Sequence, residues 1–253
     1  MLLSENGSQS AWVRAPDLVP ELPPSPCETC QVRKSNFCGA LFGDRDDWAA
    51  FRGEHRSTAA RQTVYRAGEA TEGVLLICDG WAVRFVQLPN GKRQILSVLL
   101  PGDLASPTAI GERQFAFSIQ AVTKVRYCYL PFADVRARIQ HDPALFEAWI
   151  RLTTTAQRDA DRRLVDLGQR TAQERIAALV VHVMARFEER GELHDDRFPF
   201  PLSQQQIADC TGLTPVHACR VLGLLRRNGI CNVGHGAVKI LERAELQRLA
   251  ALR

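Results

Sequence analysis

Three cysteines stand close together near the start of the chain, behind a segment rich in proline. Cys27, Cys30 and Cys38 are spaced C-x2-C-x7-C in a sequence of 253 residues that contains eight cysteines. Inside the cell thiols are kept reduced, so clustered cysteines there bind a metal or carry redox chemistry more often than they form disulfides. Thiolate sulfur is a soft ligand that selects zinc or iron–sulfur clusters over hard cations. The spacing therefore indicates a metal or redox site.

The rest of the sequence favours an intracellular location. The amino terminus, MLLSENGSQS, lacks the basic and apolar segments of a signal peptide, and the apolar run of residues 177–184 is too short to cross a bilayer. We therefore expect a cytoplasmic protein with no membrane partner. The other cysteines have simpler interpretations. Cys78 and Cys210 lie in apolar patterns typical of small buried side chains, and Cys219 and Cys231 are expected to be small uncharged side chains.

The carboxy-terminal segment, residues 197–253, has the pattern of a DNA-binding module. It carries eight Lys or Arg and three Asp or Glu, a net charge of +5, whereas the whole chain has +4. Ser203 followed by Gln206 predicts a capping box that begins a short helix, and Thr214 with Pro215 predicts the start of a second one. Two short helices joined by a glycine-containing turn form a helix-turn-helix.

The second of these helices has two distinct faces. A buried stripe is predicted for Ala218, Val221, Leu222 and Leu225. The opposite face is expected to enter the major groove, where Arg220 can pair with guanine, while Arg226 and Arg227 suit phosphates. A hairpin pattern around residues 234–236 adds a wing. The residues expected to contact DNA are Ser203, Thr214, Val216, His217, Cys219, Arg220, Arg226 and Arg227.

Between the cysteines and this module, the pattern changes from strands to a long helix. Residues 63–130 are short β-rich runs separated by turn signals, which predicts a small roll or sandwich. From Asp142 to about Gly168, apolar residues recur every three or four positions and predict one seam on a long helix. We expect this seam to form a weak homodimer interface; the alternative is a helix lying on the roll. The seam residues are Leu145, Trp149, Leu152, Ala156, Ala160, Leu164 and Leu167.

Together these segments resemble the cyclic AMP receptor protein and Fnr superfamily of bacterial transcription regulators. The resemblance covers nearly the whole chain and lies in PNGKRQI and PGDL of the roll, YLPF before the long helix, TAQERIAALVVHVMARF, and IADCTGLTPVHACRVLGLLRRNGI. It implies an α+β fold with an amino-terminal β-roll like a cyclic-nucleotide-binding jelly roll, a long dimerisation helix and a carboxy-terminal winged helix-turn-helix. The expected domains are residues 1–50 for a flexible arm with the cysteines, 51–135 for the roll, 136–170 for the dimerisation helix and 171–253 for the DNA-binding domain.

The same resemblance implies a function and a set of partners. A regulator of this kind is a homodimer that binds a palindromic site on double-stranded promoter DNA, acts with RNA polymerase, and is not an enzyme. In the Fnr branch it is mainly an activator of anaerobic or microaerobic genes. That branch typically has Glu-x-x-Ser-Arg on the recognition helix, and the matching residues here are Val216, Cys219 and Arg220. We therefore expect a half-site that differs from the usual TTGAT-like element.

The sensor is also implied by the resemblance to the Fnr branch. Cyclic-nucleotide binders follow Gly-Glu-Leu with Arg-Ser or Arg-Thr, whereas PGDL at 101–104 is followed here by FAFSIQ at 115–120. Without that arginine a cyclic phosphate would be buried without a partner, so nucleotide sensing is not expected. The expected cofactor is an oxygen-labile 4Fe-4S cluster held by four thiolates. The residues that match its ligands are Cys27, Cys30, Cys38 and Cys128.

Other sensors stay open. Four thiolates also suit a structural zinc, in a regulator that senses another small ligand such as nitric oxide. A haem sensor is less well supported because residues 63–130 contain no histidine, although a cysteine can serve as an axial ligand. The same lack of histidine argues against a cupin-like metalloenzyme, so no catalytic residues are expected.

Overall fold

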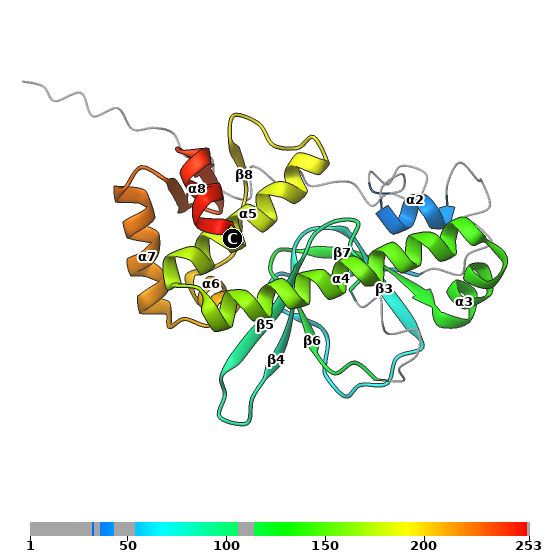
Figure 1. Ribbon diagram of the computed structural model, residues 1–253. Coiled ribbons are helices and arrows are strands. Elements are labelled where there is room, and N and C mark those ends of the chain that lie inside the picture. The colour runs from blue at the N-terminus through cyan, green and yellow to red at the C-terminus, as the bar shows by residue number, and fades with distance from the viewer. Residues whose placement is uncertain (1–31, 33–35, 43–53, 106–113, 252–253) are drawn as a thin grey trace, which may run out of the picture.

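A β-roll, a long helix and a helical carboxy-terminal module follow one another along the chain (Figure 1). The computed structural model describes residues 32, 36–42, 54–105 and 114–251. The predicted ligands Cys27 and Cys30 lie outside the described residues. The expected α+β architecture of roll, long helix and winged helix-turn-helix is confirmed.

The roll consists of two antiparallel sheets with strand orders β1-β7-β3 and β2-β6-β4-β5. Its strands enclose an apolar core in which Ile77, Ile95 and Ile119 are fully buried, and β3 is buried over five consecutive residues. A glycine is required at Gly80, between β3 and β4, because it has a φ of 80° and a Cβ there would lie 2.0 Å from the Lys124 carbonyl oxygen. The strands are β1 (Glu54–Thr58), β2 (Thr63–Tyr65), β3 (Gly73–Asp79), β4 (Ala82–Gln87), β5 (Arg93–Leu99), β6 (Ser118–Ala121) and β7 (Val125–Pro131).

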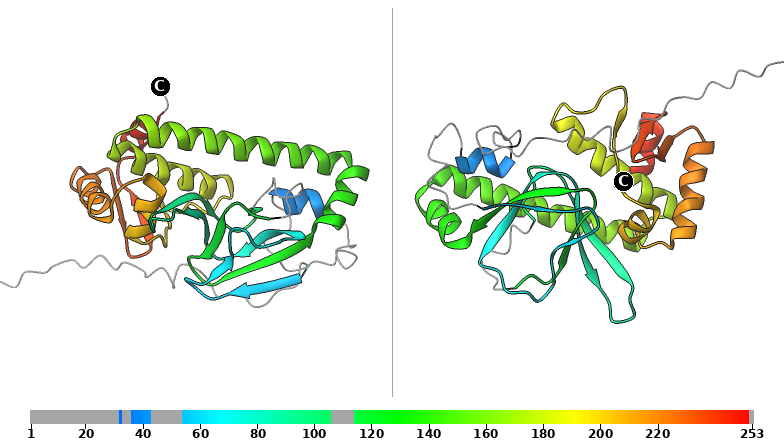
Figure 2. Two further views of the ribbon diagram at one scale, coloured as in Figure 1. Left: turned by 90° about the horizontal axis from the view of Figure 1, so that it is seen from below. Right: turned by 180° about the vertical axis from the view of Figure 1, so that it is seen from behind.

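The long helix predicted from the apolar repeat is present as α4 (Pro143–Gln169). It begins where the pattern begins, because the Asp142 carboxylate accepts hydrogen bonds from the backbone N–H groups of Ala144 and Leu145, at 3.0 and 3.3 Å. A separate helix, α3 (Phe132–His141), precedes it. Figure 2 shows α4 running along the roll and continuing to the carboxy-terminal module.

A short helix not expected from the sequence, α2 (Asn36–Phe42), packs beside the first turns of α4 (Figure 1). The rings of Phe37 and Trp149 meet edge to face with centroids 5.4 Å apart. The Nη1 atom of Arg138 donates a hydrogen bond to the Leu41 carbonyl oxygen at 3.2 Å. Phe37 and Leu41 are buried, so residues 36–42 are a packed helix and not part of a flexible arm. The neighbouring roll and α4 supply the apolar contacts that stabilise this short helix.

The face of α4 that meets the roll includes the first part of the predicted dimer seam, because Trp149 and Leu152 pack against the same hydrophobic cluster as Leu145. Leu145 is 1% exposed and lies in the core of its own roll, whereas Leu164 is 70% exposed. These two seam residues therefore do not share one surface. Two other apolar side chains of the helix, Phe146 and Ile150, are about half exposed. The assignment of the seam to a dimer interface stays a prediction, and Leu145 belongs to the intramolecular core.

The corner between α4 and α5 (Ala172–Glu189) is fixed by local caps. Thr171 and Glu174 form a capping box that begins α5. The buried Arg170 side chain pairs with Asp166 at 2.8 Å and donates to the carbonyl oxygens of residues 249 and 250. The corner is therefore joined to the end of the last helix.

The carboxy-terminal module contains the predicted helix-turn-helix and wing. Its three strands have the order β8-β10-β9, and the predicted hairpin is the pair of β9 and β10. The elements are β8 (Arg197–Pro199), α6 (Gln204–Thr211), α7 (Pro215–Arg227), β9 (Cys231–Gly234), β10 (Ala237–Ile240) and α8 (Arg243–Ala250). Within the described ranges, no helix is both long and apolar enough to cross a membrane.

One hydrophobic cluster joins the roll to this module. Trp81 and Ile95 of the roll belong to the same buried cluster as Phe187 of α5 and Ile207 of α6. The rings of Trp81 and Phe187 stack with centroids 6.0 Å apart. The module is therefore docked against the roll as well as joined to it through α4.

Candidate functional site

The two helices of the helix-turn-helix begin at side-chain caps. The Ser203 N–H donates to Gln206 Oε1 at 2.9 Å, and the Gln206 N–H donates back to Ser203 Oγ at 3.2 Å. Thr214 Oγ1 accepts from the His217 N–H at 3.2 Å. Both predicted caps are therefore present, and both hydroxyls serve to set the helix starts.

The turn between these helices needs glycine. Gly212 has a φ of 65°, a left-handed conformation, and a Cβ there would lie 3.0 Å from Leu167 Cδ2 of α4. The turn therefore presses closely against the last turns of the long helix.

Helix α7 presents the predicted recognition face to solvent. Ala218, Val221 and Leu225 are buried as predicted, while Leu222 is only partly buried. Val216 at the start of the helix is 62% exposed. The other predicted contacts on this helix are also exposed: His217, Cys219, Arg220, Arg226 and Arg227. They form a mixed apolar and cationic surface; its contact with DNA stays a prediction.

The two described members of the predicted cysteine set lie in one apolar core. Cys38, on α2, is 4% exposed, and Cys128, on β7, is 3% exposed. Both belong to the hydrophobic cluster of the roll, which also includes Phe37 and Leu145. Among the residues that the structure describes, no group of three or more His, Cys, Asp or Glu side chains is arranged to hold a metal. The other two predicted ligands lie outside that part of the chain.

The remaining cysteines fall into two groups. Cys210 and Cys231 are fully buried, and burial raises the pKa of the two thiols to about 12 and about 11, so both stay protonated. The prediction of a small buried side chain is confirmed for Cys210, whereas Cys78 is only half-buried. Cys219 is exposed on α7.

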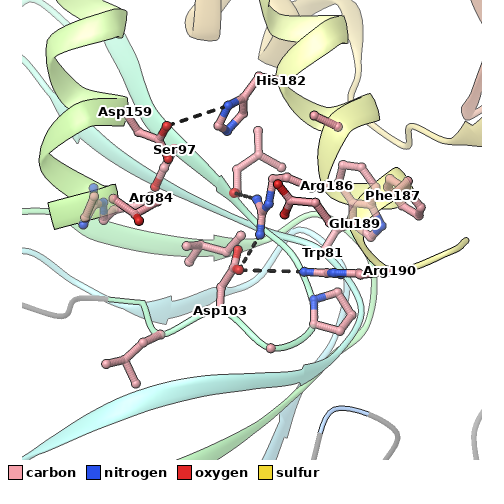
Figure 3. A pocket seen from close by; sticks show the side chains of 18 of the residues that line it. Trp81, Arg84, Ser97, Asp103, Asp159, His182, Arg186, Phe187, Glu189 and Arg190 are labelled. Atoms are coloured by element: carbon pink, nitrogen blue, oxygen red, sulfur yellow. Dashed lines mark hydrogen bonds and ion pairs between the residues drawn. The ribbon is translucent and has the colours of Figure 1, made fainter. Parts of the chain in front are cut away.

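A large cavity lies between the roll, α4 and α5, and the sequence analysis did not predict it. Its volume is about 2100 Å³ (Figure 3). Asp103 of the roll forms an ion pair with Arg186 of α5 and a longer one with Arg190, at 3.9 Å. Arg186 also donates to the Val98 carbonyl oxygen at 3.1 Å. These contacts link α5 to the roll across one side of the cavity.

His182 of α5 faces Asp159 of α4 in the same cavity (Figure 3), with Nδ1 and Oδ1 4.0 Å apart. Burial, followed by the positive charge of Arg186, lowers the pKa of His182 to about 4. The imidazole is therefore neutral at pH 7. Burial also raises the pKa of the Asp159 carboxyl group.

A second set of polar contacts joins the roll to α6. The buried Asp209 of α6 pairs with Arg93 of β5. Its second carboxylate oxygen accepts from Gln205 Nε2, and its carbonyl oxygen accepts from Gln94 Nε2, each at 2.7 Å. Sequence analysis missed this contact because Arg93 and Asp209 are 116 residues apart, and no local pattern shows that their segments meet.

A β-roll joined by a long helix to a winged helix-turn-helix is the architecture of a DNA-binding regulator. Family models agree: a cyclic nucleotide-binding domain matches residues 55–142, and a Crp-like helix-turn-helix domain matches residues 174–249. The nitrogen fixation regulation protein FixK of Bradyrhizobium diazoefficiens is 30% identical over 229 residues, which cover 89% of this chain and 94% of that protein. The transcriptional activator protein FnrA of Stutzerimonas stutzeri is 26% identical over 229 residues, which cover 88% of this chain and 92% of FnrA.

Solved structures show the same fold. The structure of FixK2 from Bradyrhizobium japonicum superimposes with a TM-score of 0.72 at 22% identity, covering 79% of this chain and 98% of that one. The chain therefore belongs to the Crp/Fnr family of transcription regulators. Proteins of this family bind DNA and act as dimers, and they are not enzymes.

Proposed function

We propose that this chain is an oxygen-responsive transcription activator that binds a 4Fe-4S cluster through Cys27, Cys30, Cys38 and Cys128. The observation that carries this proposal is that Cys38 of α2 and Cys128 of β7, 90 positions apart in the sequence, belong to one buried cluster. The names of the relatives FnrA and Anr, both transcriptional activator proteins, support the choice of an activator.

The surroundings of Cys38 and Cys128 agree with this ligand set. Thiolates in an apolar core are costly unless a cation compensates their charge. A bound cluster would supply that charge through its irons, together with an inorganic core that dioxygen degrades. The two thiols would anchor α2 to the roll from inside the core, and the two cysteines nearer the amino terminus would complete the set.

The contact between α2 and α4 supplies a route from the cysteines to dimerisation. Cys38 follows Phe37, whose ring packs on Trp149 of α4. Phe146 and Ile150, the exposed apolar residues beside Trp149, lie on the adjacent solvent face of the same helix. Holding Cys38 against Cys128 fixes α2 on the start of α4, and releasing it removes that support. A small change in this support would be enough to control a weak dimer, since about 1.4 kcal/mol alters the association constant tenfold.

The dimer would present two copies of α7 to successive major grooves of a palindromic promoter site. Arg220, which is exposed on α7, would read guanine, and Arg226 and Arg227 would contact phosphates. Bound in this way, the regulator would recruit RNA polymerase. Val216 supplies an apolar contact where the Fnr branch has a glutamate, so the half-site would differ at that base pair.

The test is a metal analysis of protein purified without oxygen. We expect about four irons and four acid-labile sulfides per chain, with little zinc. Cys128→Ser should lose the iron and sulfide, while Cys78→Ser, a cysteine of the same roll outside the proposed set, should keep both. Stoichiometric zinc without sulfide, or equal iron loss in both variants, would refute the cluster.

A further inference from the structure

The end of α8 rests on a buried arginine at the corner between α4 and α5. Arg170 follows the last residue of α4, and only 7% of its side chain is exposed. Its Nη1 donates to the Leu249 carbonyl oxygen at 3.1 Å, and its Nη2 donates to the Ala250 carbonyl oxygen at 2.8 Å. The last carbonyl groups of a helix have no partner within the helix, so these two bonds cap α8. Because Arg170 Nε pairs with Asp166 of α4 at 2.8 Å, one side chain joins the ends of both helices.

Two further arginines lie at the end of α6, the first helix of the helix-turn-helix. Arg163 of α4 donates to the Cys210 carbonyl oxygen, and Arg175 of α5 donates to the Thr211 carbonyl oxygen, each at 3.4 Å. Both bonds are long, but each places a positive charge at the negative end of the α6 dipole. Arg175 also holds the corner itself, since its Nε donates to the Arg170 carbonyl oxygen at 2.9 Å. The ends of α6 and α8 therefore both meet arginines of the corner.

The corner decides where the recognition helix lies. Helix α5 contacts α6, α7 and α8, so these helices follow α5 when it turns (Figure 2). The angle between α4 and α5 therefore sets the position of α7 relative to the long helix. In a dimer that places two copies of α7 in successive major grooves, this angle also sets the distance between the two copies.

The backbone of the corner alone would permit a hinge. Only Arg170 and Thr171 separate α4 from α5, and both have extended torsion angles. A few residues at the end of an element can absorb a change of angle between two helices. The Arg170 side chain opposes such a change, because turning α5 with α8 away from α4 would separate the guanidinium group from Asp166 or from the end of α8.

We propose that Arg170 is a positioning residue for DNA binding, which fixes the angle between α4 and α5 and thereby the distance between the two recognition helices of the dimer. A planar guanidinium group can hold two carbonyl oxygens and a carboxylate at once, and a lysine ammonium group does not reproduce this fork. The inference rests on the proposed contact of two copies of α7 with successive grooves. It uses none of the cysteine ligands, so it is independent of the iron–sulfur cluster.

DNA binding at altered half-site spacing tests this role. The reference is a duplex that the wild-type protein selects from a random library, and two further duplexes have one base pair added to or removed from the spacer between the half-sites. We expect the wild type to prefer the reference duplex. Arg170→Met should reduce this preference by at least about 10-fold, because it removes charged hydrogen bonds that hold α8. It should still distinguish the selected half-site from a scrambled one. Arg158→Met, which removes an exposed arginine of α4, should keep the spacing preference.

Two conservative variants separate positioning from general stability. Arg170→Lys keeps the charge without the fork and should lose part of the preference. Asp166→Asn removes the ion pair but keeps both bonds to α8, so it should retain most of the preference. If Arg170→Met does not fold, the comparison of these two variants decides the question. Weaker binding to all three duplexes with an unchanged preference, in Arg170→Met or in Arg170→Lys, would assign Arg170 to stability alone and overturn the proposal.

Hydrogen exchange of the α8 backbone amides gives a readout that needs no DNA. We expect exchange to be faster in Arg170→Met than in the wild type and unchanged in Arg158→Met. Unchanged exchange in Arg170→Met would overturn the proposal, because α8 would then not depend on the corner. Selected duplexes without paired half-sites would refute the palindromic site of the proposed function, and hydrogen exchange would then decide on Arg170 by itself.

Discussion

Arg93 Nε lies 2.7 Å from Asp209 Oδ2, so β5 of the roll holds α6, the first helix of the helix-turn-helix, through a direct ion pair. The two side chains are only 20% and 8% exposed. Arg93 also donates to Gln120 Oε1 at 2.8 Å and stacks over Phe85, with 5.1 Å from its Cζ to the ring centroid. The DNA-binding module is therefore positioned by the roll as well as by α4.

Removing one member of this pair should be costly. Asp209→Ala leaves Arg93 without its carboxylate partner in a largely buried contact, and we expect a loss on the order of 3 kcal/mol in the free energy of unfolding. The double variant Arg93→Met/Asp209→Leu should recover part of that loss. Urea unfolding measures all three proteins. The exposed pair of Glu245 and Arg248 is the control, and its disruption should leave the unfolding midpoint unchanged. A double variant that is no more stable than Asp209→Ala would contradict the coupling.

His182 should make stability depend on acidity. Its pKa is about 4 in the folded chain, below the 6.5 of an unperturbed histidine, so the unfolded chain binds the extra proton between these values. The contribution of neutral His182 to the free energy of unfolding is fully present above pH 6.5. It is lost as the pH falls toward 4, by roughly 3 kcal/mol in total. His182→Gln should flatten that slope in denaturant unfolding, whereas His141→Gln, at an exposed position, should not. Equal slopes in all three proteins would show that another group carries the acid sensitivity.

Arg220 and Arg226 should differ in their effects on DNA binding. If Arg220 reads a base as proposed, Arg220→Ala should cost about 1–3 kcal/mol on the specific site and leave non-specific binding nearly unchanged. If Arg226 contacts a phosphate, Arg226→Ala should weaken both kinds of binding and reduce the slope of log affinity against log salt concentration by about one. Fluorescence anisotropy on selected and on scrambled duplexes, at several salt concentrations, distinguishes the two. A selective footprint retained by Arg220→Ala would refute its assignment as the base reader.

Two leucines of α4 separate the core from the proposed dimer surface. Leu164→Glu changes a side chain that is 70% exposed and should prevent dimerisation without lowering the stability of the monomer. Leu145→Ala removes a side chain of the roll core and should lower the free energy of unfolding by about 2–5 kcal/mol. Analytical ultracentrifugation and urea unfolding measure the two effects. A stable dimer of Leu164→Glu would place the interface elsewhere on the chain.

Features set by neighbouring residues could be predicted from the sequence. The capping box of Ser203 with Gln206, the cap at Thr214 and the start of α4 at Asp142 all depend on contacts within three positions, and each is present. The buried stripe of α7 follows from helical periodicity alone, although Leu222 at its edge is only partly covered. Local chemistry therefore predicted most of the helix-turn-helix.

Features that depend on distant parts of the chain were missed. Helix α2 has only seven residues and is stabilised by Trp149 and the roll, so its own sequence does not predict it. An apolar repeat shows that α4 has an apolar face, but it does not show that Leu145 meets the roll while Leu164 meets solvent. Likewise, the cavity that brings His182 close to Asp159 exists only once the roll, α4 and α5 are packed together.

The continuity of α4 has a mechanical consequence. The helix has 27 residues and no break, so it spans about 40 Å, and the distance from Trp149 to Leu167 along its axis is about 27 Å. A tilt of about 10° at the Trp149 end would move the Leu167 end by about 5 Å. The Gly212 turn packs closely on Leu167 and would have to follow or separate. Because α4 is one unbroken helix, a small change of its angle beside α2 would reach the helix-turn-helix as a displacement of about one helical turn.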